Sequence, residues 1–219
     1  MKTNSKFFYY FISWTCIFIC VADFFVTYEL GEHFPNYSQM GDSISKLGSA
    51  ISPVAFYTST WWVFIGAVFI LFGISFRKVY PENGKAVIFA SWLIIIYGLG
   101  EGFGSGLFQA NHIGDKLSLS CKIHDSLGGI GIAAILILPL ALRKVFRRIE
   151  HPFMFHFSMV VLILGLTMFV LFTLAKISGF ANNIFEVYFG LWQRLLTIVI
   201  YSNLVAIGIM MMKKLRVVS

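Results

Sequence analysis

The chain has 219 residues, of which 58% are hydrophobic and only 12% are charged, and its mean hydropathy is +0.81. A soluble domain carries about 25% charged residues, and a small protein cannot hide so much apolar surface in its own core. The formal net charge of +7 would suggest nucleic-acid binding in a soluble protein, but charges outside a bilayer need no such partner. Three cysteines exclude a disulfide scaffold. The composition therefore predicts an integral membrane protein that does not bind nucleic acid.

Six stretches of the sequence are apolar over about the 20 residues that a helix needs to cross a bilayer. In chain order they run near 7–27, 56–76, 86–107, 126–142, 154–174 and 188–212. They predict an all-α fold, a six-helix bundle that forms a single transmembrane domain over residues 1–219. The longest connection, from Glu29 to about Ala55, is expected to pack over the helix ends.

The first stretch has an alternative interpretation as a cleaved secretory signal. Lys2 and Lys6, the apolar run and the sequence Cys20-Val21-Ala22 match a signal with a cleavage site. The run is longer and more aromatic than a usual signal core, and Asp23 follows without a flexible spacer. A retained membrane span is therefore favoured.

Basic residues are concentrated on one side of the predicted membrane. Short cytoplasmic connections of membrane proteins carry an excess of Lys and Arg. Twelve of the 17 basic residues lie in the N-terminal arm, the second and fourth connections and the C-terminal tail, namely Lys2, Lys6, Arg77, Lys78, Lys85, Arg143, Lys144, Arg147, Arg148, Lys213, Lys214 and Arg216. This side carries a net charge of +10 and the rest of the chain −3. Both termini are therefore expected in the cytoplasm.

The ionisable residues within or beside the spans gather at the opposite, outer side. Such residues are costly in a bilayer and mark function by default. They are Asp23, Glu29, Asp42, Glu101, His112, Asp115, His124, Asp125 and Arg194, with Gln193 beside the last. An outward-facing polar pocket beneath the first outer loop is the expected consequence.

Glu101 is the most informative of these residues, because it lies about two thirds of the way along the third span. An unpaired carboxylate at that depth would cost several kcal/mol. Arg194 is the expected partner, since both residues lie in the outer halves of their helices. The alternative to a functional site is a buried pair that only fixes helix packing.

Glycines recur throughout the third span. Small residues four positions apart let helices approach closely in lipid. This spacing is found at Gly98, Gly102 and Gly106, interleaved with Gly100 and Gly104. Helix packing is favoured, and an oligomer could form through this helix. The alternative is that the glycines leave room for a lipid chain or headgroup beside Glu101.

Several of the outer residues are candidates for metal binding or catalysis. His112, His124 and Asp125 could ligate a zinc-like ion, although their spacing differs from that of any compact metal motif. Glu101, His124 and Asp125 are the candidate catalytic acids and bases. A simpler interpretation is that His124 caps the fourth helix beside Asp125.

Three segments taken together resemble the bacterial membrane family known as domain of unknown function 998. They are Asp42–Gly48 followed by Pro53, Gly100–Phe108 with His124-Asp125 and Gly128-Gly129 downstream, and Gly190–Arg194. The segment Ile-Ser-x-Leu-Gly is more faintly similar to the Frag1/DRAM/Sfk1 membrane family, some members of which are linked to lipid remodelling. The resemblance implies a six-helix protein of the bacterial inner (plasma) membrane, and it implies no established activity.

The leading hypothesis is a pocket that binds a lipid headgroup or another small polar ligand, with membrane lipids as partners. Its candidate ligand-binding residues are Asp42, Ser45, Glu101, His112, His124, Gln193 and Arg194. One alternative is a membrane hydrolase or transferase that acts on lipid, with or without a metal. A second is a structural or assembly partner in the membrane. The residue pattern identifies no cofactor.

Overall fold

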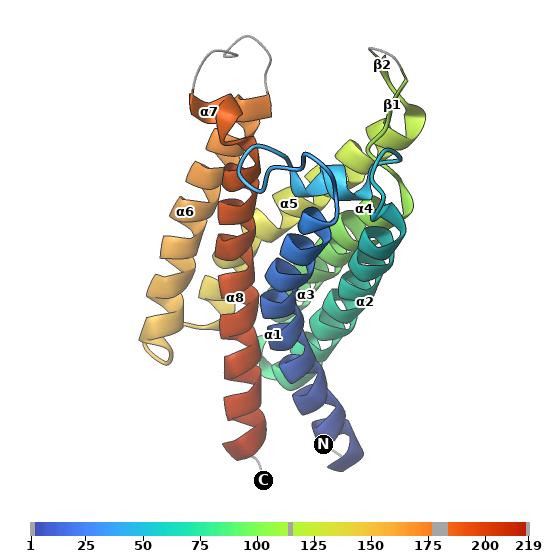
Figure 1. Cartoon of the computed structure of the whole chain (residues 1–219). Helices are drawn as coiled ribbons and strands as arrows, with labels where there is room; N and C mark the ends of the chain where they lie inside the picture. The colour runs from blue at the N-terminus through green and yellow to red at the C-terminus, as the bar shows by residue number, and fades with distance from the viewer. Residues whose placement is uncertain (1–2, 114–115, 177–183, 218–219) are drawn as a thin grey trace.

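The computed structural model is a bundle of six long helices, and it describes residues 3–113, 116–176 and 184–217 (Figure 1). The long helices are α1 (Thr3–Glu32), α2 (Ala55–Val79), α3 (Gly84–Tyr97), α5 (Leu119–Val145), α6 (Pro152–Lys176) and α8 (Phe189–Val217). The third span continues from α3 through the π-helix η3 (Gly98–Gly104) into α4 (Ser105–Leu107). The described residues thus contain six helices long and apolar enough to cross a membrane, which confirms the predicted all-helical, multi-pass architecture.

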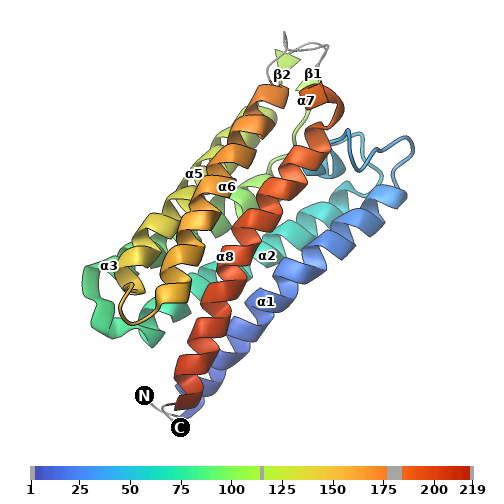
Figure 2. The same cartoon turned by 90° about the vertical axis from the view of Figure 1, so that its left-hand side faces the viewer.

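Short elements connect the spans. The 3-10 helix η1 (Ile44–Gly48) precedes α2, and η2 (Pro81–Asn83) joins α2 to α3. The antiparallel strands β1 (His112–Ile113) and β2 (Lys116–Leu117) precede α5, and α7 (Ile184–Val187) precedes α8. Figures 1 and 2 show both termini at one end of the bundle, here called the termini end. The strands, η1 and α7 lie at the opposite end, here called the loop end.

The six spans follow chain order around the bundle. Each span packs against the next, and α8 returns to contact α1. Aromatic side chains of α2 fill much of the interior, where Phe69, Phe72 and Phe76 are almost completely buried. Large apolar side chains also cover the outside of the bundle, as on α6, where Phe153 is 73% exposed. A bilayer would cover this outer surface, because a helix that is apolar all round is typical of a membrane span.

The fourth span begins at Leu119, earlier than its apolar stretch at 126–142 predicts. Ser118 is the N-cap, and its side-chain oxygen accepts a hydrogen bond from the backbone N–H of Cys121 at 3.0 Å. The expectation that His124 and Asp125 open and cap this helix is therefore wrong, because both lie in its second turn. Hydropathy locates only the apolar part of a helix, whereas its first turns here are polar.

The glycines of the third span lie at close contacts between helices. A Cβ atom at Gly102 would overlap the Cα of Gly66 in α2, and one at Gly100 would lie 2.9 Å from the Cα of Gly131 in α5. The glycines therefore let the third span approach α2 on one side and α5 on the other, as the prediction of close packing requires. These contacts lie within the chain, and an oligomer contact through this helix stays a prediction.

Candidate functional site

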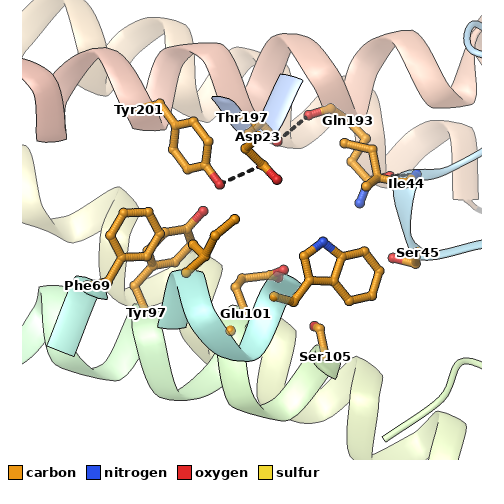
Figure 3. A pocket seen from close by; sticks show the side chains of 13 residues that line it. Asp23, Ile44, Ser45, Phe69, Tyr97, Glu101, Ser105, Gln193, Thr197 and Tyr201 are labelled. Carbon is orange, nitrogen blue, oxygen red and sulfur yellow. Dashed lines mark hydrogen bonds between the residues drawn. The ribbon is translucent and has the colours of Figure 1, made fainter. Parts of the chain in front are cut away.

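A cavity of about 60 Å³ lies towards the loop end, between α1, α2, the third span and α8 (Figure 3). Its polar lining consists of Asp23, Ser45, Glu101, Ser105, Gln193 and Thr197. Its remaining lining consists of Ile44, Trp62, Ile65, Phe69, Tyr97, Gly102 and Tyr201. The cavity therefore brings two carboxyl groups together inside an otherwise apolar bundle.

Asp23 of α1 is one of these carboxyl groups, and only 6% of the residue is exposed. Its Oδ1 accepts a hydrogen bond from the indole N–H of Trp61 at 2.8 Å, and its Oδ2 accepts one from the Tyr201 hydroxyl at 2.9 Å. The carboxyl group thus ties α1 to α2 and α8. The set of candidate binding residues omitted Asp23, although a carboxylate inside the first apolar stretch was a signal for it.

Glu101 is the second carboxyl group, and it lies in the middle of η3. Figure 3 shows Glu101 and Asp23 on opposite sides of the cavity. Behind Glu101 lies Gly128 of α5, where a Cβ atom would approach the carboxyl Oε1 to 2.9 Å and the Ser105 hydroxyl oxygen to 3.6 Å. A π-helix is rare and is frequent at functional sites. This one places the Glu101 side chain between α5 and the cavity.

Arg194 of α8 does not pair with Glu101, so the expected ion pair is wrong. One guanidinium nitrogen donates to the carbonyl oxygens of Asp42 and Gly190, both at 3.1 Å. The other donates to the Tyr37 hydroxyl at 2.8 Å and to Gln39 Oε1 at 2.7 Å. The guanidinium group therefore faces the connection between α1 and α2, which supplies three of its four oxygen acceptors.

The beginning of α8 holds this connection in place. We call residues 33–54 the outer segment and residues 190–194 the latch. Beyond the Arg194 contacts, Gln193 Oε1 accepts a hydrogen bond from the Ile44 N–H at 2.7 Å, and the Leu191 N–H donates to the Met40 carbonyl at 2.9 Å. Two of the segments that carry the family resemblance are therefore bonded to one another. Their contact holds η1, with Ile44 and Ser45, against the cavity.

Asp42 organises the outer segment and does not line the cavity. Its carboxylate accepts a hydrogen bond from the Ser38 N–H at 2.8 Å and forms an ion pair with Lys46 at 2.6 Å. Nearby, burial raises the pKa of the Tyr37 phenol above its ordinary value. Tyr37 therefore keeps its proton at neutral pH and can donate it to the Ser43 carbonyl at 3.1 Å.

The histidines expected at the site have other positions. His124 is buried, and its Nδ1 lies 2.8 Å from the Phe108 carbonyl oxygen, which ties α5 to the end of the third span. Neither His124 nor the half-buried Asp125 lines the cavity. The side chain of His112 lies outside the part of the chain that the structure describes. Among the described residues, no group of three or more His, Cys, Asp or Glu residues could hold a metal ion.

The six candidate binding residues whose side chains the structure describes thus divide into three groups. Ser45, Glu101 and Gln193 line the cavity, Asp42 and Arg194 hold the outer segment, and His124 ties two helices. Tyr97, Tyr201 and Trp62 also line the cavity. Sequence reasoning omitted these aromatic residues because nothing distinguishes them from the many other aromatic residues in the spans.

The fold and the cavity define a multi-pass membrane protein with a small polar cavity near one end of its helix bundle. A family model described as "Protein of unknown function (DUF998)" matches residues 18–210, and the chain belongs to this family. The matched range contains all three segments that carry the resemblance. No curated protein and no solved structure matches the chain.

Proposed function

We propose that this protein binds a lipid headgroup or another small polar ligand in the cavity between α1, α2, the third span and α8. The observation that supports this most strongly is that Asp23 and Glu101 line one cavity inside an apolar bundle. Carboxyl groups at such depth are costly, and they are retained in membrane proteins mainly where they serve a function. The close approach of the third span to α2 and α5 does not depend on the Glu101 carboxyl group, because glycines provide it.

The other polar groups of the cavity suit a ligand that forms hydrogen bonds. Ser45, Ser105 and Gln193 add two hydroxyl groups and an amide to the two carboxyl groups. A binding site is typically apolar with a small number of placed polar groups, which is the composition found here. Because the volume is only about 60 Å³, the cavity admits the end of a headgroup and not a whole lipid.

We place the loop end on the outer side of a bacterial inner membrane. The support is that twelve of the 17 basic residues lie in the termini and in the connections at the termini end. Positive charge in short connections sets the orientation of membrane proteins. The ligand would then enter from the outer leaflet or from the outer solution.

This orientation predicts the accessibility of two exposed positions to a membrane-impermeant thiol reagent. In a background where Cys16, Cys20 and Cys121 are replaced by alanine, Glu29→Cys is expected to react in intact cells. Arg148→Cys is expected to react only after the membrane is permeabilised. The reverse pattern would show that the termini lie outside.

Binding has more support than the two alternatives. Of the three candidate catalytic residues of a lipid hydrolase, only Glu101 lines the cavity, because His124 and Asp125 lie outside its lining. The third span is less available to an assembly partner, because its glycines pack against α2 and α5 of the same chain.

Filling the cavity tests the proposed function. Ser105→Leu adds apolar bulk at a buried lining position, and we expect it to lower the amount of co-purified ligand at least tenfold. Native mass spectrometry of the chain purified from its own membranes measures this ligand as an added mass. Ser126→Leu, at an exposed position of α5, is the matched control and should retain the ligand. Equal added mass in both variants would contradict the proposal.

A further inference from the structure

We infer that the ligand of this cavity presents a small organic ammonium group, either as a free amine or as the end of a lipid headgroup. This inference rests on the proposed function, because it names the chemistry of the ligand that the same cavity would take. Three features of the lining carry it: its charge, its aromatic rings and its size.

The first feature is charge. Asp23 and Glu101 are acidic, and the lining contains no Lys, Arg or His among the described residues. Two carboxylates in an apolar bundle need compensating positive charge, whether from protons or from a cation. An anionic ligand such as a bare phosphate would add to the repulsion, and an ammonium group would relieve it.

The charge of the cavity is also not balanced by Arg194 or Lys46, although both belong to elements that line it. Arg194 belongs to α8, which lines the cavity, yet its guanidinium donates to oxygens of the outer segment and of Gly190. Lys46 belongs to η1, and its ammonium group pairs with Asp42 at 2.6 Å. The interactions that these two cations already make leave the compensation at the cavity to protons or to a cationic ligand.

The second feature is an aromatic wall. Phe69 lies 5.3 Å from Tyr97 and 5.8 Å from Tyr201 between ring centroids, and all three line the cavity together with Trp62. The faces of aromatic rings carry partial negative charge and attract cations, with Trp the strongest. The same faces repel an anion. Aromatic rings and carboxylates together form the type of surface that recognises ammonium compounds.

The third feature is size. Pockets for drug-sized ligands measure roughly 300–1,000 Å³, far more than the cavity here. A volume of about 60 Å³ suits a group of a few non-hydrogen atoms, such as an aminomethyl group. A polar cavity of this size would otherwise fill with water. The carboxyl groups of Asp23 and Glu101 on opposite sides could both accept N–H donors from one ammonium group.

The test uses the full chain in nanodiscs made only of phosphatidylglycerol, which carries no ammonium group. Methylammonium, methanol and acetate are titrated separately, and binding is followed by tryptophan fluorescence, since Trp62 lines the cavity. We expect methylammonium to bind at least tenfold more tightly than methanol or acetate. This comparison needs no variant, so it does not depend on whether a substituted chain folds.

Glu101→Gln then locates the binding. Because it removes one charged acceptor and keeps the shape, methylammonium affinity should fall roughly tenfold or more. The matched control is Glu29→Gln, which changes an exposed glutamate at the same end and should leave the affinity unchanged. An equal decrease in both variants would overturn the inference.

The remaining outcomes separate the two proposals. If acetate or methanol binds as tightly as methylammonium, and Ser105→Leu abolishes that binding, the ammonium inference is wrong and the binding function stands. If none of the three probes binds and no co-purified ligand is found, both are wrong. Phosphatidylethanolamine added to the nanodiscs distinguishes the sources, since a lipid headgroup in the cavity would compete with methylammonium and raise its apparent Kd.

Discussion

Replacing Gly102 by alanine is expected to destabilise the protein by about 3 kcal/mol, the upper part of the usual range for an overpacked interior. A Cβ atom at this position would overlap the Cα of Gly66 and would lie 2.8 Å from its backbone nitrogen. Backbone atoms cannot move aside as the end of a flexible side chain can. The third span and α2 must therefore separate, and this separation also disturbs the cavity that Gly102 lines.

The matched control for this prediction is Gly129→Ala in α5. Apart from its chain neighbours and the backbone of its own helix, no atom lies within 4 Å of a Cβ atom at Gly129, so alanine meets open space there. We expect this variant to be neutral or up to about 1 kcal/mol more stable, because alanine favours a helix over glycine. Thermal or denaturant unfolding in detergent measures both variants. Equal stability of the two would contradict the close contact between the third span and α2.

Much of the fold could be predicted from the sequence because a membrane imposes simple rules. Apolar length locates the spans, and the four-residue spacing of Gly98, Gly102 and Gly106 predicts close packing. The π-helix around Glu101 was not predicted, because hydropathy and spacing do not distinguish one helical hydrogen-bond pattern from another. Glycines make an unusual backbone possible without specifying which one forms.

The candidate site was only partly predictable, and Arg194 shows the physical reason. A sequence indicates how deep a residue lies along its helix, and it correctly placed Arg194 and Glu101 towards the same end. It does not indicate how each helix is rotated about its axis within the bundle. Arg194 faces the oxygens of the outer segment, whereas Gln193, the adjacent residue, lines the cavity.

Asp23 illustrates a second limit of sequence reasoning. Its sequence position lies near the outer end of the first stretch, and it does not indicate which side chains bind the carboxyl group. In the structure α1 continues to Glu32, so Asp23 lies well inside the helix and accepts hydrogen bonds from α2 and α8. Both partners, Trp61 and Tyr201, are far away in sequence, and only the folded bundle brings them to Asp23.

Replacing Arg194 by alanine is expected to release the outer segment from the bundle. The substitution removes the hydrogen bonds to Tyr37, Gln39 and the Asp42 carbonyl. Hydrogen bonds that involve a charged group contribute roughly 1.5–3 kcal/mol each when buried, although their effects are not additive. Amide hydrogen exchange in residues 37–45, measured by mass spectrometry, should accelerate at least tenfold, since each 1.4 kcal/mol corresponds to about tenfold.

The control for Arg194→Ala is Arg147→Ala, which removes an exposed arginine at the termini end and should leave the exchange of residues 37–45 unchanged. Unaltered exchange in Arg194→Ala itself would contradict the role of the latch.

The Arg194→Lys variant distinguishes the hydrogen bonds of the latch from a simple ion pair with Glu101. If Arg194 served only as a positive charge opposite Glu101, lysine would preserve that charge, and residues 37–45 would stay largely protected from amide hydrogen exchange. The observed geometry instead uses two guanidinium nitrogens to reach four separate oxygen atoms, two of them backbone carbonyls. A single ammonium group cannot reach all of these acceptors at once. We therefore expect the amides of residues 37–45 to exchange nearly as fast in Arg194→Lys as in Arg194→Ala. Full protection of these amides in the lysine variant would favour the ion pair.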